Sequence, residues 1–212
     1  MQDLSAFQHP RFARMYERLS AEAERHGMTG LRRRLLSGLS GRVVEVGAGN
    51  GLNFPHYPPR VSEVVAIEPE DRLRALGERA AALAPVPVTV VRGHGGSLPY
   101  EAGSFDAAVV SLVLCSVPDS AVLLAELRRA LRPGGELRFF EHVRSANPVR
   151  GVLQDLITPL WRLMAGDCRP NRDTGAAIRE AGFVIEDSDR FVHRATPGSP
   201  ALTHVLGLAR RP

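Results

Sequence analysis

The sequence predicts an α/β fold in which a doubly wound, mostly parallel sheet carries helices on both faces. Short β-branched runs alternate with helical patterns from Val43 onward, and this alternation is typical of such sheets. One run, at 107–114, is an almost continuous apolar stretch, as expected for a strand buried on both faces. A glycine-rich turn directly follows the first run. Active sites of open α/β sheets lie at that edge, beyond the carboxyl ends of the strands.

The elements follow in chain order from local signals. The expected strands are 43–46, 63–67, 86–91, 107–114 and 137–140. Between the second and third strands, good helix formers over 71–84 predict a helix that Pro85 ends. Between the fourth and fifth strands, Asp119 can cap a helix that runs to Leu131, and Pro133-Gly134-Gly135 then turns the chain. The succession of strand and helix favours parallel strands in the core of the sheet.

Two segments do not follow this alternation of strands and helices. Residues 1–40 are expected to form an N-terminal helical lid segment of one or two amphipathic helices, with apolar residues set between arginines: Phe7, Phe12, Met15, Tyr16 and Leu19. Residues 144–172, inside the main domain at 41–212, form an insertion with apolar residues at helical spacing, interrupted by Pro159. Both segments are expected to wall the active edge of the sheet, the insertion on the substrate side. The apolar stripe of the insertion indicates either core packing or a cover over a hydrophobic acceptor.

The composition excludes several mechanisms. The chain has 212 residues, which suits one domain with a small appendage, and its 27 basic residues are all arginine. Without lysine, no Schiff-base, pyridoxal-phosphate or P-loop chemistry is available. Against 23 acidic residues the net charge is +4, a mild excess that does not indicate a nucleic-acid partner. The run 31–36 contains three adjacent arginines. It is interpreted as a solvated face rather than a lipid contact, so membrane contact is not expected.

Cysteine usage and hydropathy favour a reduced cytoplasm. Cys115 and Cys168 are the two cysteines, too few for a disulfide framework and not spaced as a zinc site, so no metal is expected. A redox pair between them stays open, because sequence gives no separation between their Cα atoms. Residues 1–20 lack the apolar core of a signal peptide. The longest apolar run, 107–117, is about half the roughly 20 residues of a membrane span.

The most informative motif is Glu45-Val46-Gly47-Ala48-Gly49-Asn50-Gly51, after the first strand. Glycine is needed where backbone approaches a ligand closely or adopts a positive φ. A second acid, Glu68, ends the second strand and can accept both hydroxyls of an adenosine ribose. The leading acid, Glu45, suits a ligand that bears an ammonium group, because it would repel a pyrophosphate. An adenosine that carries an amino acid satisfies both acids.

Four motifs, taken in order, resemble those of class I S-adenosylmethionine-dependent methyltransferases: 43–51, 66–69, 103–106 and 131–135. A narrower resemblance to the small thiol S-methyltransferases of the methyltransferase-like group is carried by 51–58, 112–117, 141–143 and 167–168. The stretch 53–58 is also similar to bacterial phospholipid N-methyltransferases. The resemblance implies a Rossmann-like sheet of about seven strands with an antiparallel last strand. The membrane anchor of the animal thiol enzymes is not carried over to this chain.

The resemblance also implies S-adenosyl-L-methionine as cofactor and a set of residues that bind it: Glu45, Gly47, Ala48, Gly49, Asn50, Gly51, Asn53, Glu68, Pro69, His94, Gly95, Ser111, Leu112 and Ser116. The family usually places an acid after the third strand to meet the adenine amino group. This chain has Gly93-His94-Gly95-Gly96 there. Either a neutral nitrogen of His94 or backbone carbonyls are therefore expected to accept from adenine.

The expected reaction is methyl transfer to a small, largely apolar acceptor, a thiol foremost, in detoxification or natural-product tailoring. A phospholipid amine, phenol or quinone acceptor and a catalytically silent cofactor-binding protein are the alternatives. The candidate bases are His142, Glu141, Asp167 and His56, with His142 placed first because it titrates near neutral pH. The residues expected to line the acceptor site are Tyr57, Cys115, Trp161, Met164 and Cys168. The oligomeric state is not predicted.

Overall fold

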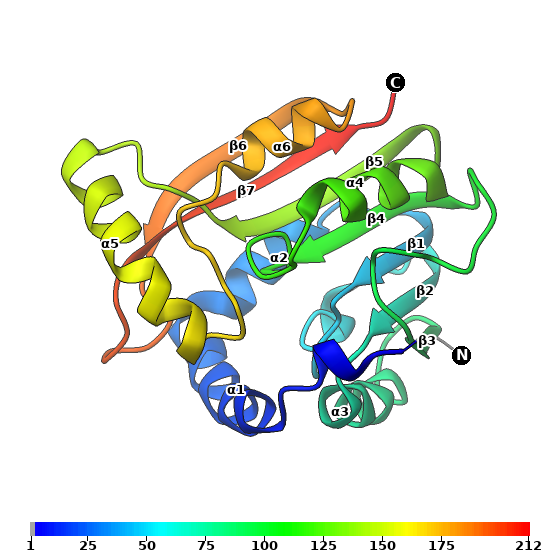
Figure 1. Cartoon of the computed structure of the whole chain (residues 1–212). Coiled ribbons are helices and arrows are strands. Elements are labelled where there is room, and N and C mark those ends of the chain that lie inside the picture. Colours follow the sequence, from blue (N-terminus) through cyan, green and yellow to red (C-terminus); the bar gives the residue numbers. More distant parts are fainter. Residues whose placement is uncertain (1–2) are drawn as a thin grey trace.

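A seven-stranded sheet forms the centre of the computed structural model, which describes residues 3–212 (Figure 1). The strand order is β3-β2-β1-β4-β5-β7-β6. The strands are β1 (Gly41–Val46), β2 (Val61–Glu68), β3 (Val88–Arg92), β4 (Phe105–Ser111), β5 (Leu131–His142), β6 (Val184–His193) and β7 (Leu202–Arg210). The first five strands pair in parallel, whereas β7 pairs antiparallel with both β5 and β6. The predicted fold class, including the antiparallel last strand, is confirmed.

Helices cover both faces of the sheet, as predicted. They are α1 (Pro10–Ala23), α2 (Thr29–Leu36), α3 (Asp71–Ala81), α4 (Ser120–Ala130), α5 (Pro148–Met164) and α6 (Thr174–Glu180), with short turns η1 (Ser5–Phe7), η2 (Glu24–Met28) and η3 (Phe54–His56). The side chain of Asp119 caps α4 by accepting from the backbone N–H groups of Ala121 and Val122. The strand expected at 107–114 ends earlier than predicted. Leu112 has a φ of 61°, so β4 stops at Ser111.

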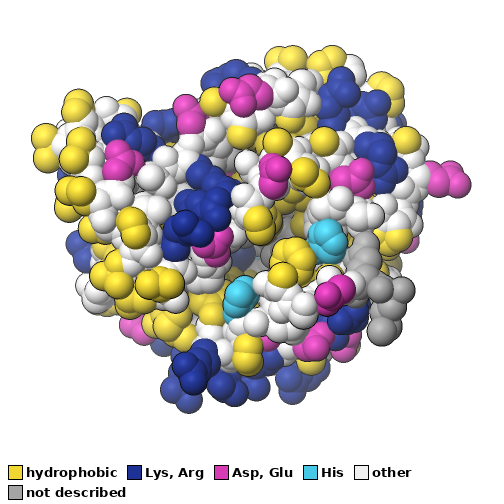
Figure 2. All heavy atoms as spheres, viewed as in Figure 1, with side chains coloured by type: hydrophobic (Ala, Val, Ile, Leu, Met, Phe, Trp, Pro, Cys, Tyr) yellow, Lys and Arg dark blue, Asp and Glu magenta, His cyan; other side chains and the backbone are white. Residues whose placement is uncertain are grey.

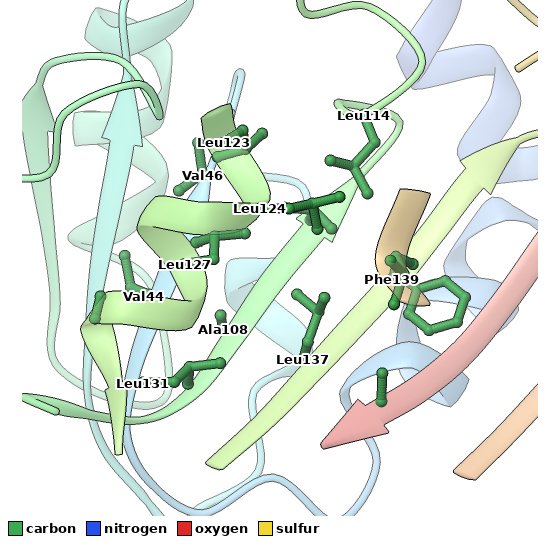
Figure 3. Packing of buried hydrophobic residues seen from close by; sticks show 14 of the residues in the cluster. Val44, Val46, Ala108, Leu114, Leu123, Leu124, Leu127, Leu131, Leu137 and Phe139 are labelled. Atoms are coloured by element: carbon green, nitrogen blue, oxygen red, sulfur yellow. The ribbon is translucent and has the colours of Figure 1, made fainter. Parts of the chain in front are cut away.

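Two hydrophobic clusters fill the space between the sheet and its helices. Leucines of α4 pack on β1, β4 and β5, on the face that α6 also covers (Figure 3). Leu35 and Leu36 of α2 belong to the second cluster, with Val43 and Val109 of the sheet. Because neighbouring residues of a strand point to opposite faces, Val43 and Val44 enter different clusters. The sheet is therefore rigidly packed on both sides, and its carboxyl edge offers fixed positions for a site.

The orientation of helix α5 contradicts one of the two interpretations of the insertion, core packing of its apolar stripe. It runs unbroken through Pro159, and its large apolar residues face solvent: Val149, Val152, Leu153, Leu156, Leu160, Leu163 and Met164. Leu156 is 73% exposed, so the core-packing interpretation of this stripe is wrong. Figure 2 shows hydrophobic side chains gathered over α5, at the left of the view. The buried side carries Gln154 and Thr158 instead.

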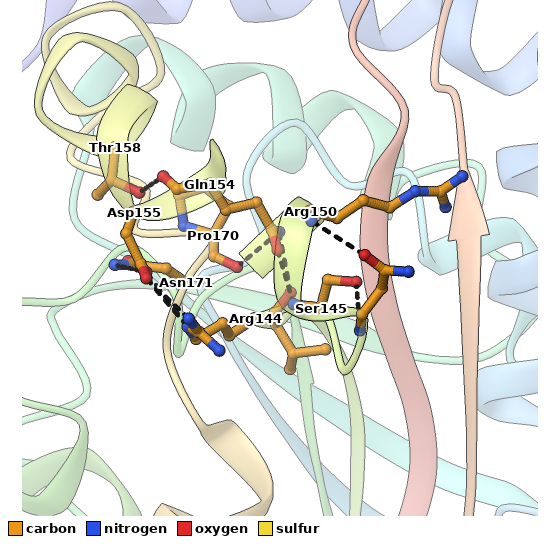
Figure 4. A network of polar contacts seen from close by, with 10 residues as sticks. Arg144, Ser145, Arg150, Gln154, Asp155, Thr158, Pro170 and Asn171 are labelled. Atoms are coloured by element: carbon orange, nitrogen blue, oxygen red, sulfur yellow. Dashed lines mark hydrogen bonds and ion pairs between the residues drawn. The ribbon is translucent and has the colours of Figure 1, made fainter. Parts of the chain in front are cut away.

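The polar side of α5 is buried because its side chains supply hydrogen bonds to irregular backbone. Gln154 donates to the carbonyl oxygens of Val143 and Pro170 and accepts from the N–H of Ser145. Figure 4 shows this network, which joins α5 to the end of β5 and to the segment after the helix. Burying the polar residues of α5 therefore satisfies backbone groups that no strand or helix can pair. Among the described residues, no helix is long and apolar enough to cross a membrane.

The arginine run in α2 is a solvated face only in part, because Arg33 and Arg34 are exposed whereas Arg32 is not. Arg32 is only 5% exposed. Its guanidinium donates to Glu24 at 2.8 Å and to the side-chain oxygen of Asn53 at 2.9 Å. A buried guanidinium needs such partners, since an unpaired buried charge is costly. Arg32 thereby ties the N-terminal helices to the loop that follows the glycine-rich turn.

Candidate active site

A cavity of about 860 Å³ opens at the carboxyl edge of the sheet, within the range of roughly 300–1,000 Å³ usual for small-molecule sites. Its walls come from the glycine-rich turn, the ends of β2 and β4, the N-terminal segment and the end of α5. The lining residues are Ala6, Phe7, Gln8, His9, Pro10, Arg11, Phe12, Tyr16, Gly47, Gly49, Glu68, Pro69, Glu70, Leu73, Ser111, Leu112, Val113, Ser116, Val117, Pro118, Arg162, Leu163, Gly166 and Asp167. The expected position of the site is thus matched by a cavity.

The glycine-rich turn exposes backbone to this cavity. Gly47 and Gly49 have φ values of 70° and 58°, a region that side-chain-bearing residues rarely adopt. A Cβ atom at Gly47 would lie 2.5 Å from Val113 Cγ2, inside the side chain across the cavity wall. At Gly49 the nearest atom to such a Cβ is in Tyr16, 3.6 Å away. The absence of side chains therefore leaves room for a ligand to approach the backbone at Gly49.

Glu68 is placed at the floor of the cavity by its position at the end of β2. Its carboxylate accepts from the N–H groups of Gly49 at 2.7 Å and Glu70 at 2.9 Å. Burial raises the pKa of Glu68 to about 7. Each carboxylate oxygen has a second lone pair, which can accept a ribose hydroxyl. Together with the cavity-lining backbone of Gly49 and the apolar side chain of Leu73, this arrangement fits the adenosine and amino-acid parts of S-adenosylmethionine.

The N-terminal segment closes the other side of the cavity. Gln8 donates to the carbonyl oxygen of Pro69 at 2.7 Å and accepts from the N–H of Asp71 at 3.1 Å. Further along α1, Glu17 forms an ion pair with Arg72 of α3 at 2.6 Å. These contacts hold residues 6–16 against the loop that follows β2. That this segment acts as a moving lid stays a prediction.

Glu45 lies behind the cavity and not in its wall, which corrects its expected contact with the ligand. It is 1% exposed, and its oxygens accept from Asn53 at 2.7 Å and from the hydroxyl of Tyr57 at 2.8 Å. Burial raises the pKa of Glu45 to about 7. The three side chains fix the loop after the glycine-rich turn. Asn53, expected at the cofactor, and Tyr57, expected at the acceptor, are therefore both internal to the protein.

His94 is oriented so that it cannot accept from adenine as expected. Its Nδ1 atom accepts from the N–H of Gly96 at 3.1 Å, so a neutral ring carries its proton on Nε2 and has no free acceptor. The ring stacks on Phe7, with 5.0 Å between ring centroids. His94 thus supports the N-terminal wall through Phe7. Gly95 contacts the core instead, because a Cβ there would lie 2.3 Å from Leu123 Cδ1.

The remaining expected cofactor residues divide between wall and interior. Those that line the cavity are Gly47, Gly49, Glu68, Pro69, Ser111, Leu112 and Ser116. Ala48, Asn50 and Gly51 face away from it; the Asn50 side chain, for example, donates to the hydroxyl of Ser20 in α1 at 3.2 Å. The turn therefore presents alternate residues to ligand and to protein.

Glu141 holds the loop that follows β4. Its carboxylate is fully buried and accepts three backbone N–H groups, from Val113 and Leu114 at 2.9 Å each and from Cys115 at 3.1 Å. Burial raises the pKa of Glu141 although these three hydrogen bonds act to lower it. Both oxygens are therefore committed to the loop. This geometry corrects the expected role of Glu141 as a base: it is a positioning residue for the cavity wall.

Asp167 is the one expected base that lines the cavity. It follows α5 with a φ of 61°, a conformation that an aspartate tolerates better than most residues. One carboxylate oxygen pairs with Arg162 at 2.7 Å and the other with Arg169 at 2.8 Å. Both oxygens are thus engaged by guanidinium groups, and the pair presents Arg162 to the cavity.

His142 lies one layer behind the cavity, next to both cysteines. Its Nδ1 atom is 3.4 Å from Cys168 Sγ and 3.6 Å from Cys115 Sγ. The neighbouring Cys115 thiol lowers the pKa of Cys168, as does His142, although burial opposes them. Burial acts to lower the pKa of His142, but the charge of Cys168 outweighs it, so the His142 pKa is raised. His142 is thus bonded within the protein and does not line the cavity.

The acceptor wall consists of other residues than those expected. Cys115, Cys168, Trp161 and Met164 are not among the lining residues, and neither is His56. Their neighbours Ser116, Asp167, Arg162 and Leu163 line the cavity instead. Phe7, Phe12 and Tyr16 belong to the N-terminal segment that was expected to wall the active edge, but the sequence did not show which of its residues would line the cavity.

The comparisons agree with the fold. Residues 44–139 match a family model described as a methyltransferase domain. The chain is 33% identical over 186 residues to thiol S-methyltransferase TMT1B of Homo sapiens. This similarity covers 82% of this chain and 73% of that protein. It is 30% identical over 114 residues to phosphatidylethanolamine N-methyltransferase of Cereibacter sphaeroides, or 53% of this chain and 56% of that protein.

A solved structure shares the same fold. The S-adenosylmethionine-dependent methyltransferase from Mesorhizobium loti superposes with a TM-score of 0.63, over 88% of this chain and 98% of that chain. The sequence identity is 24%.

The environment of Glu68 predicts a pH-dependent affinity for the cofactor. Ribose hydroxyls donate to the ionised carboxylate, so the dissociation constant of S-adenosylmethionine should fall as the pH rises from about 6 to about 8, through the raised pKa of Glu68. Glu68→Gln should weaken binding roughly 10- to 100-fold, since a hydrogen bond to a charged group contributes about 1.5–3 kcal/mol. Calorimetric titration at both pH values measures the two effects. A pH dependence of the same size in Glu68→Gln would contradict this assignment, and Glu101→Gln serves as the control.

The buried position of Glu141 predicts that its removal costs stability. Glu141→Ala leaves three backbone N–H groups without their acceptor, and each unsatisfied buried donor costs about 1–3 kcal/mol. The free energy of unfolding in urea should therefore fall by about 3 kcal/mol or more. Glu101→Ala, at an exposed position, should leave it unchanged. A Glu141→Ala protein with unchanged stability but no activity would instead support the catalytic role.

Proposed function

Since this chain belongs to the S-adenosylmethionine-dependent methyltransferases, we propose that it methylates the sulfur of a small, largely apolar thiol. The observation that carries the proposal is the similarity to thiol S-methyltransferase TMT1B, which extends over 82% of this chain. That span includes far more than the cofactor-binding part that methyltransferases of many specificities share. The lining of the cavity supports the same acceptor class.

The acceptor side of the cavity is largely apolar. Its apolar side chains come from α1, from the loop after β4 and from the end of α5: Phe12, Leu112, Val113, Val117 and Leu163. The charged groups beside them are Arg162 and its partner Asp167. Such a surface accommodates a hydrophobic molecule with one anionic or readily ionised atom. A thiol fits this description, because its unperturbed pKa is about 8.5.

Bound S-adenosylmethionine supplies an electrophilic methyl group on a sulfonium. The chain's own residues then have three tasks: Glu68 and the backbone at Gly49 orient the adenosine and amino-acid parts, the apolar wall excludes water, and Arg162 faces the acceptor. Transfer forms a bond between the acceptor sulfur and the methyl carbon while the carbon–sulfonium bond breaks. The thiol proton leaves to solvent before transfer, and a few per cent of thiolate at neutral pH suffices for a strong nucleophile.

Arg162 replaces the general base that the sequence analysis expected, because it favours ionisation of the acceptor by its charge and does not accept a proton. Its guanidinium stabilises a thiolate in the cavity by charge, so less of the acceptor needs to be ionised in free solution. Asp167 fixes that guanidinium at 2.7 Å and is therefore a positioning residue. The arrangement disfavours an amine acceptor, because a protonated amine would be repelled by both the arginine and the sulfonium.

The acceptor class is tested by methyl transfer from S-adenosylmethionine to a panel of small thiols, phenols and phospholipid amines, read by mass spectrometry. We expect a mass gain of one methylene on apolar thiols. Gly49→Arg is the matched control: it fills the cavity beside Tyr16 and should abolish both cofactor binding and transfer. Transfer to phospholipid amines alone would overturn the thiol proposal in favour of the activity that the Cereibacter sphaeroides relative is named for.

The role of Arg162 predicts a shift in the pH profile. In Arg162→Gln, the rising limb of kcat against pH, measured at saturating acceptor, should move to higher pH, because kcat reports ionisation of the bound thiol, which loses a stabilising charge. The activity deficit should be roughly tenfold at neutral pH, corresponding to about one pKa unit, and should shrink at alkaline pH. Arg150→Gln, near the other end of α5, is the control. A deficit that stays constant across the pH range would show that Arg162 does not act on ionisation of the acceptor.

A further inference from the structure

A cluster behind the acceptor wall has no task in the proposed methyl transfer. It consists of Cys115 after β4, His142 at the end of β5 and Cys168 after α5, and the three ligand atoms all lie within 4.8 Å of one another. We propose that Cys115, His142 and Cys168 form a zinc-binding site, with the two sulfur atoms and Nδ1 as ligands. This inference goes beyond the proposed function, because it does not depend on which acceptor the cavity takes.

The separations between the ligand atoms are those that a tetrahedral zinc ion imposes. Bond lengths of about 2.3 Å to sulfur and about 2.0–2.1 Å to nitrogen place two sulfurs about 3.8 Å apart and a sulfur and a nitrogen about 3.5 Å apart. In this protein the two sulfurs are 3.6 Å apart, and the two sulfur–nitrogen separations are 3.4 and 3.6 Å. The three side chains therefore already surround a position of the right size.

The chemistry of the three ligands suits a buried zinc ion. Cys115 is fully buried and Cys168 is 4% exposed, and burying an isolated charge is costly. Two thiolates neutralise the charge of Zn²⁺, so the complete centre with a neutral imidazole carries no net charge. Sulfur and imidazole ligands are the usual ones in protein zinc sites. With three protein ligands, tetrahedral coordination leaves one position for water or another small ligand.

Each ligand is held in place by backbone contacts that do not involve the other two. Glu141 accepts from the N–H of Cys115, and the carbonyl oxygen of Cys115 accepts from the N–H of Arg169 at 2.7 Å. The N–H of Cys168 donates to Ala165 at 3.1 Å. His142 pairs with His204 of β7 in the sheet register. The site is therefore preformed by the fold, and binding requires little reorganisation.

A zinc ion here would join two segments of the acceptor wall, the loop after β4 and the chain that follows α5, to the end of β5 behind them. Cys115 and Cys168 directly adjoin Ser116 and Asp167, which line the cavity. The polar network around Gln154 in Figure 4 already connects α5 to the end of β5. Metal binding would add a second connection between these segments and would fix the cavity wall more tightly.

The test uses the full chain, reduced with a phosphine and freed of metal, and titrates Zn²⁺ against a chromophoric chelator. We expect one zinc ion per chain. Cys168→Ser and His142→Ala should each weaken binding at least about 100-fold, more than substitution of a residue that only hydrogen-bonds to a metal ligand usually does. His26→Ala removes an exposed histidine outside the cluster and should leave the affinity unchanged.

Substitution by Co²⁺ identifies the ligands directly. The wild-type protein should show the near-ultraviolet charge-transfer absorption of thiolate bound to cobalt, and Cys168→Ser should lose about half of it or more. The inference is overturned if the reduced wild-type chain binds Zn²⁺ no more tightly than Cys168→Ser, or if the bound ion shows no thiolate absorption. These readouts need no methyl acceptor, so failure of the thiol proposal would leave them unaffected.

Discussion

The acceptor side of the cavity depends on one buried carboxylate, that of Glu141, and its three backbone hydrogen bonds. The loop after β4 leaves the sheet with a positive φ at Leu112, so its next N–H groups have no strand partner. Glu141 on the adjacent strand supplies the missing acceptor. This single side chain therefore sets where Val113 meets the glycine-rich turn and where Cys115 lies. Glu45 and Glu68 are also buried carboxylates, near the ends of β1 and β2, and their hydrogen bonds likewise hold the chain that follows each strand.

The sheet, its parallel core and the glycine-rich turn were predictable, because they follow from local signals such as the apolar run of β4 and the cap at Asp119. Glu68 was predictable because a strand end fixes the position of its side chain. The direction of Glu45 was not, since the sequence does not show that Asn53 and Tyr57 return to its carboxylate. The orientation of His94 was not predictable either, since its hydrogen bond with Gly96 decides which ring nitrogen is free.

Helix α5 shows why pattern alone misplaces an insertion. Its apolar stripe indicated either core packing or a cover over a hydrophobic acceptor. The structure instead buries Gln154, because the surrounding backbone needs hydrogen bonds. The cluster of Cys115, His142 and Cys168 was also beyond sequence reasoning. Its members come from three elements that only the fold brings together, at spacings that match no linear zinc motif. Both errors concern contacts between segments distant in sequence, where periodicity carries no information.

The N-terminal wall has a kinetic consequence. Residues 6–16 cover the site of the cofactor and are fastened by Gln8 and by the ion pair of Glu17 with Arg72. The demethylated cofactor remains after each transfer. If residues 6–16 act as the predicted lid, their detachment would let it leave, and in many enzymes such opening, rather than chemistry, limits the rate. We expect a rapid first turnover followed by a slower steady state, whose rate reflects how often this segment opens.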